Sequence, residues 1–224
     1  MVARISLREG KFRKVIDGTE THIFDSDTLD AVIVNAGRVS RIYYANQYDP
    51  NKPTAPVCWS SDTQRPDPDV ADAHRQSGRC IDCPHNIKGS GGNNARACKY
   101  SQRIAVVLED NLEEVYQIQL PATSLFGPAG SGWMSMQNYA RHLNNHNTSA
   151  ISVVTRMGFE KDGYIPRLRF RPMRVLGEEE LQKAAELESH PNTLQAITLV
   201  QGGDRVVSPF SEVEGFVFKE ANLQ

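Results

Sequence analysis

The sequence has no long apolar run and no cysteine outside one short stretch. Its 224 residues nowhere approach the roughly 18 consecutive apolar positions that a membrane-spanning helix requires. The basic N-terminus, MVARISLREGKFRK, is followed by no apolar segment of the kind found in secretory signals. Sequence repeats and collagen-like or coiled-coil periods are also missing. We therefore expect a folded, non-membrane, cytoplasmic protein, long enough to bury a core.

Neither sign of charge dominates the chain as a whole. The formal net charge is −2, but residues 1–174 carry +4 and residues 175–224 carry −6. No predicted helix is basic, so a recognition helix for duplex DNA is missing. Two interpretations remain open: chance drift in surface charge, or a body that binds a polyanion followed by an acidic region for protein partners.

All four cysteines lie within 41 residues, in the pattern C-x21-C-x2-C-x14-C, and are Cys58, Cys80, Cys83 and Cys98. Two thiolates spaced as C-x-x-C can reach one ion, and zinc accepts four thiolates tetrahedrally. The sequence around them is rich in Gly, Pro, Asn and Asp and poor in apolar residues. Such a segment needs a cross-link because burial alone cannot order it. The pattern predicts one structural zinc ion.

Three alternatives to a four-cysteine zinc site remain open. Two disulfides would suit a secreted protein, although a C-x-x-C pair is a poor structural staple. A C-x-x-C redox centre would leave Cys58 and Cys98 unexplained, and His74 or His85 could replace one cysteine as a ligand. Four thiolates would fill the coordination shell, and no H-x-E or H-E-x-x-H pattern supplies a general base. The predicted ion is therefore structural and not catalytic.

Alternating and β-rich runs predict three hairpins around this segment. Strands 29–34 and 39–44 are joined by Asn-Ala-Gly at 35–37, strands 104–109 and 115–120 by Asp-Asn, and strands 151–159 and 164–171 by Lys-Asp-Gly. A helix at 134–145 separates the second and third hairpins. This order predicts a mainly β fold with minor α, an OB-like antiparallel barrel with an inserted zinc-binding loop segment. An open antiparallel sheet with one helix is the alternative.

The C-terminal quarter has a different character. Glu178 begins a predicted acidic helix that ends near Ser189, and residues 201–224 combine Gly-Gly and Ser-Pro breaks with acidic excess. We predict an OB-like core at 1–175, with 56–100 as the inserted zinc-binding segment. Residues 176–224 would form the C-terminal helix and a partly disordered tail. A last strand at 215–219 that packs on the sheet is the alternative for the tail.

Cations and aromatic rings occur together in several segments, as single-stranded nucleic acid requires for its phosphates and bases. Alternate arginines from 167 to 171 would share one strand face at about 6.6 Å spacing. The predicted nucleic-acid contacts are Arg41, Tyr43, Tyr48, Trp59, Lys99, Tyr100, Arg103, Arg167, Arg169 and Arg171. The alternative is that the tyrosines are half-buried core residues and the arginines only solubilise an edge strand.

The segments PVCWSSD, RCIDCPHN, GSGG and ACKYSQRIAVV, followed by PATSLFG and YIPRLRF, resemble those of a known family. They are similar to the embedded zinc-binding segment of bacteriophage single-stranded DNA-binding proteins of replication and recombination. The resemblance implies an OB-like core that coats exposed single strands, in the host cytoplasm if the chain is phage-encoded. It also implies a zinc ion on the four cysteines and cooperation with a polymerase or recombinase. The C-terminus, FVFKEANLQ, departs from the dense acidic tail of many such proteins.

The sequence thus predicts a non-catalytic, sequence-tolerant single-stranded DNA-binding protein that uses its C-terminal region for protein partners. Two other functions remain open. A nuclease or deaminase would need clustered acids near the basic face, and the candidates are Asp62, Asp67, Asp69 and His74. A zinc-stapled module that binds proteins through the acidic C-terminal region is the other.

Overall fold

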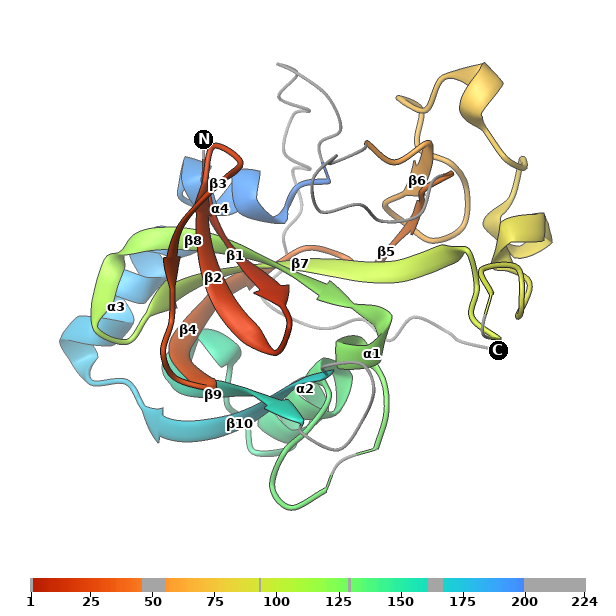
Figure 1. The fold of residues 1–224 in the computed structure, drawn as a ribbon. Coiled ribbons are helices and arrows are strands. Elements are labelled where there is room, and N and C mark those ends of the chain that lie inside the picture. The colour runs from red at the N-terminus through yellow and green to blue at the C-terminus, as the bar shows by residue number, and fades with distance from the viewer. Residues whose placement is uncertain (1, 46–54, 93, 129, 161–166, 200–224) are drawn as a thin grey trace. The chain divides into compact units, whose positions relative to one another are not determined.

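The computed structural model describes residues 2–45, 55–92, 94–128, 130–160 and 167–199 (Figure 1). The chain divides into two compact units. The described part of unit 1 covers residues 2–37 and 103–198, and that of unit 2 lies between residues 38 and 102. Because their relative placement is not determined, each unit is described by itself.

Strands make up most of the regular structure. Unit 1 contains β1 (Ala3–Arg8), β2 (Lys11–Ile16), β3 (Thr19–Ile23), β4 (Thr28–Ala36), β8 (Asn111–Pro121), β9 (Val153–Glu160) and β10 (Arg167–Val175). Its helices are α1 (Ala122–Leu125), α2 (Met136–Asn145), η4 (Ala150–Ser152), α3 (Glu178–Glu188) and α4 (Pro191–Ile197). Unit 2 contains β5 (Ser40–Tyr43), β6 (Cys58–Ser60), η1 (Asp72–His74), η2 (Cys80–Asp82) and η3 (Pro84–Asn86). Strand β7 (Cys98–Leu108) begins in unit 2 and ends in unit 1.

The strands of unit 1 form a strongly curled half-barrel sheet in the order β10-β9-β4-β7-β8-β1-β2-β3 (Figure 1). The curl brings Phe12 of β2 against Phe159 of β9, with ring centroids 4.8 Å apart, although four strands separate them in the sheet. The predicted mainly β class is therefore confirmed. One detail differs from an antiparallel barrel, because β1 and β8 pair in parallel with Ile5 opposite Ile118.

Two helices cover one face of this sheet. Val32, Val34, Val107 and other small apolar side chains of β4, β7, β8 and β9 pack against Ala184 of α3 and Ala196 of α4. The amide of Asn35 donates to the carbonyl of Glu188 at 3.0 Å, and that of Gln117 donates to the carbonyl of Ala196 at 2.6 Å. Residues 178–197 therefore belong to the core of unit 1.

The opposite face of the sheet is filled by the larger side chains and by α2. Met136 and Tyr139 of α2 are fully buried, and the Tyr139 ring stacks on Phe170 of β10 at 6.0 Å. The Tyr139 hydroxyl also pairs with the hydroxyl of Thr155 at 2.7 Å, which satisfies both buried groups. Because helices cover one face and the curl covers the other, the run Ala31–Val34 of β4 is completely buried.

The predicted hairpin between residues 29–34 and 39–44 is wrong. Strands β4 and β5 do not pair with each other, since both lie antiparallel to β7: β4 pairs along residues 104–108 and β5 along residues 98–101. Gly37 lies between the end of β4 and the start of β5, and it donates its N–H to the carbonyl of Arg103 at 2.8 Å. A Cβ at Gly37 would lie 2.5 Å from the carbonyl oxygen of Ile197. The Asn-Ala-Gly sequence therefore does not form a hairpin turn. It separates two strands that both pair with β7, and its glycine leaves room for the backbone of Ile197.

The other predicted elements are largely present. Strands β7 and β8 pair, as do β9 and β10, and α2 and α3 occupy the predicted helical segments. The turn predicted at 161–163, the tail and the alternative strand at 215–219 lie outside the described residues. Strands β1 to β3 and helix α4 were not predicted. No helix within the described ranges has both the length and the apolar character needed to cross a membrane.

Unit 2 is a small antiparallel sheet, β6-β5-β7, followed by turns and short 3-10 helices. Among its described residues, Ile42, Pro56 and Val70 join Cys80, Cys83 and Cys98 in the buried apolar set. Long stretches between β6 and β7 are exposed. Apolar burial is therefore scarce in this unit, as the composition predicts.

Candidate functional site

Strand register brings two of the four cysteines to one face of the unit 2 sheet. Tyr43 of β5 lies opposite both Cys58 of β6 and Cys98 of β7. Arg41, two residues earlier, lies opposite Ser60 and Tyr100. Because cross-strand partners point to the same face and alternate residues share a face, these side chains form one surface of the sheet.

The C-x-x-C pair lies on two consecutive 3-10 turns. Cys80 opens η2, Cys83 lies between η2 and η3, and the Cys83 N–H donates to the carbonyl of Cys80 at 3.3 Å. The Cys80 N–H donates to the carbonyl of Gln64 at 2.7 Å, while the side-chain amide of Asn86 donates to the carbonyl of Cys80 at 3.0 Å. These bonds fix the turn from both sides without using the thiols.

All four cysteines line one pocket of unit 2, together with Arg41, Tyr43, Trp59, Ser60, Pro66, Gln76 and Ser77. All four are free, and three of them are buried. As positioned, no three His, Cys, Asp or Glu side chains within the described ranges form a ready-made metal-binding group. The donor chemistry fits zinc, which thiolate sulfur binds well.

Burial favours the protonated form of three of these thiols. It raises the pKa of Cys98 to about 11 and also raises the pKa of Cys58 and Cys80. At Cys58 the nearby backbone N–H of Gln76 acts against this effect and lowers the pKa in part. Donors aimed at sulfur stabilise the thiolate form that a metal requires.

Arg41, a predicted contact for nucleic acid, is buried among these groups. Only 7% of the residue is exposed. Its guanidinium donates to the side-chain oxygen of Asn86 and to the hydroxyl of Tyr100, and it lies 4.0 Å from the centroid of the Tyr100 ring. Tyr43 stacks on His85 at 3.9 Å. Arg41 therefore belongs to the interior of unit 2 in this structure.

The remaining predicted contacts of unit 2 lie elsewhere. Trp59 and Lys99 flank Ile42 on the opposite face of the sheet, with Trp59 half-buried and Lys99 exposed. Tyr48 lies outside the described residues. In unit 1, Arg103 donates to the carbonyl of Thr198. Within unit 2, the described contacts thus lie on two faces of the small sheet.

The three arginines of β10 also have different surroundings. Arg167 is exposed, whereas Arg169 is 5% exposed, donates to the carbonyl of Thr123 at 3.0 Å and pairs with Glu160 at 2.9 Å. The guanidinium of Arg171 lies 4.5 Å from the centroid of the Trp133 ring. Arg169 is therefore a structural residue here, because its charge is satisfied by the protein itself.

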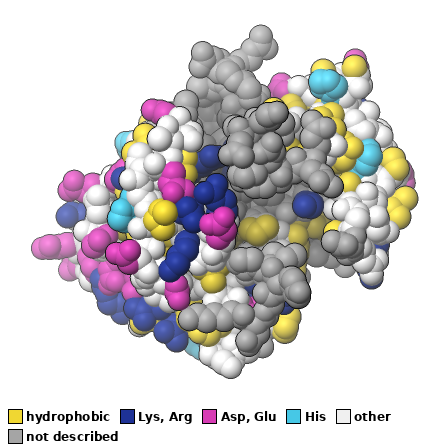
Figure 2. Space-filling model, in the orientation of Figure 1, with side chains coloured by type: hydrophobic (Ala, Val, Ile, Leu, Met, Phe, Trp, Pro, Cys, Tyr) yellow, Lys and Arg dark blue, Asp and Glu magenta, His cyan; other side chains and the backbone are white. Residues whose placement is uncertain are grey.

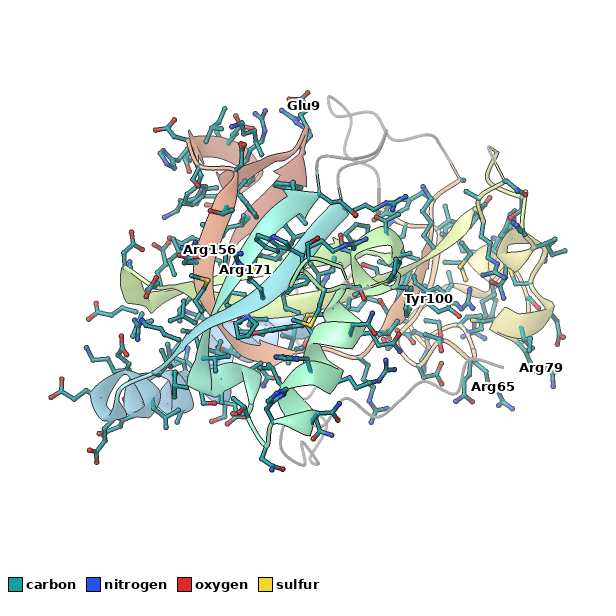
Figure 3. All side chains as sticks on the ribbon, turned by 90° about the horizontal axis from the view of Figure 1, so that it is seen from below. Glu9, Arg65, Arg79, Tyr100, Arg156 and Arg171 are labelled. Atoms are coloured by element: carbon teal, nitrogen blue, oxygen red, sulfur yellow. The ribbon has the colours of Figure 1, made fainter. Side chains whose placement is uncertain are left out.

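Besides the predicted contact Lys99, unit 2 carries exposed cations that the predicted contacts do not include. Arg65, for example, projects away from the ribbon (Figure 3). No described residue forms a hydrogen bond or ion pair with the side chains of Arg38, Arg65, Lys88, Arg96 and Lys99, and all five are exposed. The sequence signal for these exposed cations is a local excess of positive charge, since residues 38–102 hold nine Lys and Arg against six Asp and Glu.

The acids of unit 2 are mostly occupied. Asp62 accepts from the Ser60 hydroxyl and from the backbone of Gln64 and Arg65. Burial acts to raise the pKa of Asp62, but these donors outweigh it and lower the pKa. Asp67 accepts from the backbone and hydroxyl of Ser61. These carboxylates stabilise turns, as expected for loop residues.

Further along unit 2, Asp72 pairs with Arg75 at 2.9 Å and Asp82 pairs with Arg79 at 2.7 Å. Both pairs are exposed and lie three residues apart in sequence. His74 is exposed in η1. These two acids therefore neutralise nearby arginines. None of the five exposed, unengaged cations of unit 2 forms an ion pair with a described carboxylate.

Unit 1 has the opposite electrostatic character. Its basic and acidic side chains lie next to one another, as the mixed dark-blue and magenta atoms in the left part of Figure 2 show. Lys11 pairs with Asp27 at 2.9 Å and Lys14 pairs with Glu114 at 3.0 Å. Most strand cations of this unit are therefore compensated within the unit.

Comparison with known proteins found no match to this chain among family models, curated proteins or solved structures. Any function must therefore be argued from the geometry of the chain itself.

Proposed function

We propose that this protein is a non-catalytic, sequence-tolerant single-stranded DNA-binding protein of replication or recombination, and that unit 2 supplies the phosphate contacts. The carrying observation is that Arg38, Arg65, Lys88, Arg96 and Lys99 are exposed and unengaged by described residues, whereas cations of unit 1 are mostly ion-paired. Exposed, uncompensated cations attract a polyanion, and phosphate binding gains free energy by releasing counterions.

A single strand fits this unit better than a duplex. Trp59 and Lys99 lie on one face of the small sheet. A base of single-stranded DNA can therefore stack on the Trp59 ring while a phosphate of the same DNA strand contacts Lys99. Stacking of one base on an aromatic ring is worth about 1–3 kcal/mol. Helix α3 begins with three glutamates, and α2 has Arg141 as its one Lys or Arg. Neither helix offers a basic surface for a major groove.

The four cysteines would hold one structural zinc ion in unit 2. A bound zinc ion supplies cross-linking free energy that this unit lacks in apolar burial. Cys58 and Cys98 would contribute from β6 and β7, the two strands that flank β5, and Cys80 and Cys83 from the 3-10 turns. The proposal assumes a cytoplasmic compartment, of the host if the chain is phage-encoded, where thiols stay reduced. A polymerase or recombinase would be recruited through the C-terminal region.

Titration of the protein with labelled oligo-dT, a matched duplex and a matched RNA strand tests this function. We expect tight oligo-dT binding that weakens steeply with salt, and weaker duplex binding. Equal affinity for oligo-dT and duplex, or no binding at low salt, would contradict the proposal. Metal-dependent cleavage of the oligonucleotide would instead support a nuclease.

A further inference from the structure

The most unusual charge in unit 2 is Arg41, because it is buried beside the cysteines and no described residue supplies a counter-charge. Its side chain lines the same pocket as the four thiols. Its hydrogen-bond partners, Asn86 and Tyr100, are both neutral, and no described carboxylate pairs with it. Its Nε atom is buried and has no hydrogen-bond partner. A buried cation without an anion is costly, so this arrangement requires a compensating group.

We infer that Arg41 is the counter-cation of a tetrathiolate metal centre formed by Cys58, Cys80, Cys83 and Cys98, and that it sets the affinity of that centre for a divalent ion. Four thiolates around Zn²⁺ carry a net charge of about −2. A buried guanidinium beside them offsets half of that charge. This inference rests on the zinc site of the proposed function and assigns a positioning role to a residue that is not itself a ligand.

The surroundings of Arg41 also tie it to the ligand geometry. The side-chain oxygen of Asn86 accepts from Arg41, while the side-chain nitrogen of Asn86 donates to the carbonyl of Cys80 at 3.0 Å. The Tyr100 ring packs against the guanidinium and its hydroxyl accepts a hydrogen bond. Arg41 is thus held in place by one residue on the C-x-x-C turns and another on β7. Its side chain lines the same pocket as Cys80 and Cys98.

Metal affinity of charge variants tests this role. We expect Arg41→Met to weaken zinc binding at least about tenfold in competition with a chromogenic chelator, the range typical for supporting residues of a metal site. Arg41→Lys should recover part of the loss, because it keeps the charge but not the planar hydrogen bonds. Lys99→Met removes an equal charge from an exposed position of the same unit and should change the affinity less than about twofold.

Cobalt substitution provides a spectroscopic measurement. Co²⁺ bound to four thiolates gives strong thiolate charge-transfer bands, and we expect Arg41→Met to need more Co²⁺ to reach them than the parent protein and Lys99→Met. Equal titration curves for Arg41→Met and Lys99→Met would overturn the role of Arg41 while leaving the zinc site intact. A parent protein that binds neither Zn²⁺ nor Co²⁺ would overturn the zinc site itself, and the inference with it.

A second variant covers the case in which Arg41→Met does not fold. Asn86→Asp has nearly the same shape and keeps Arg41, but it gives the guanidinium a carboxylate partner and so withdraws its charge from the thiolates. We expect this variant to remain folded and to lose zinc affinity as well. Unchanged zinc affinity in a folded Asn86→Asp variant would contradict the inference.

Discussion

At the scale of single residues, burial decides which arginines of β10 can act outside the protein. Arg169 and Arg167 lie on one strand two residues apart, and both approach Glu160. The distances differ, at 2.9 Å for Arg169 and 3.9 Å for Arg167, and only Arg167 is exposed. The sequence predicts the shared face but not the identity of the arginine that is buried there, because burial depends on helix α1, whose Thr123 carbonyl accepts from Arg169.

We expect Arg169→Met to destabilise the protein by about 2–3 kcal/mol, below the usual cost of breaking a fully buried pair because Glu160 is partly exposed. Urea unfolding measures this change. Arg167→Met is the matched control and should cost less than about 1 kcal/mol, as exposed pairs do. Similar losses of stability in the two variants would contradict the structural role of Arg169.

Trp133 and Gly158 form a second residue-level constraint. A Cβ at position 158 would lie 2.7 Å from Cη2 of Trp133, whose ring also faces the guanidinium of Arg171. The indole therefore packs directly on the backbone of β9 where a side chain would clash. The sequence shows the glycine within a strand but not the ring that covers it.

Gly158→Ala is expected to cost about 1–3 kcal/mol through overpacking. The same substitution in a Trp133→Leu background should cost less than about 1 kcal/mol, because the ring is gone. A double-mutant cycle by chemical denaturation compares the two values. Equal costs in both backgrounds would show that the ring is not what excludes a side chain at this position.

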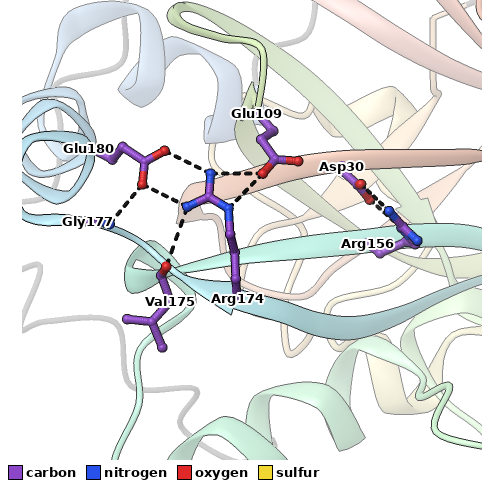
Figure 4. Close-up of polar contacts among 7 residues, drawn as sticks. All are labelled: Asp30, Glu109, Arg156, Arg174, Val175, Gly177 and Glu180. Carbon is purple, nitrogen blue, oxygen red and sulfur yellow. Dashed lines mark hydrogen bonds and ion pairs between the residues drawn. The ribbon is translucent and has the colours of Figure 1, made fainter.

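At the scale of elements, an ionic cluster fastens the start of α3 to the sheet (Figure 4). Arg174 of β10 pairs with Glu180 of α3 at 2.8 Å and with Glu109, which follows β7, at 2.8 Å. The backbone N–H of Gly177 also donates to Glu180 at 2.8 Å. The hydrogen bonds from Arg174 and then from Gly177 lower the pKa of Glu180 to about 2.

This shift predicts the pH dependence of stability. Because the pKa of Glu180 in the folded state lies below its ordinary value of 4.5, its contribution is complete above pH 4.5 and is lost as the pH falls towards about 2. Glu180→Gln should therefore lower the urea midpoint near neutral pH, and its difference from the parent should shrink through this window. A difference that stays constant down to pH 2 would contradict the assignment.

The elements also show where sequence patterns succeed and fail. The hairpins β7-β8 and β9-β10 follow from alternating runs separated by short polar turns, which is a local signal. The failed hairpin had the same local signal, but β4 and β5 instead share the long partner β7. Strand β3 is exposed throughout and carries no apolar pattern that would predict it. Pairing between distant segments is not encoded in a local window.

At the scale of the whole molecule, the net charge of −2 is an average over two different units. Residues 38–102 hold an excess of Lys and Arg, while residues 2–37 and 103–198 hold fourteen Lys and Arg against seventeen Asp and Glu. The sequence predicted the cysteine segment and its excess of cations. The sequence could not show which cations are already paired with carboxylates of the same protein, because ion pairs such as Arg169 with Glu160 form only in the folded chain.

The salt dependence of oligo-dT affinity in paired charge variants tests the central claim most directly. If all five unengaged cations of unit 2 contact phosphates, log K should fall with log salt with a slope of about −3.5. Lys88→Ala/Lys99→Ala should make that slope shallower by about 1.4, whereas Lys11→Ala/Lys183→Ala, an equal charge change in unit 1, should leave it unchanged. Equal slopes for the two double variants would contradict the assignment of single-strand binding to unit 2.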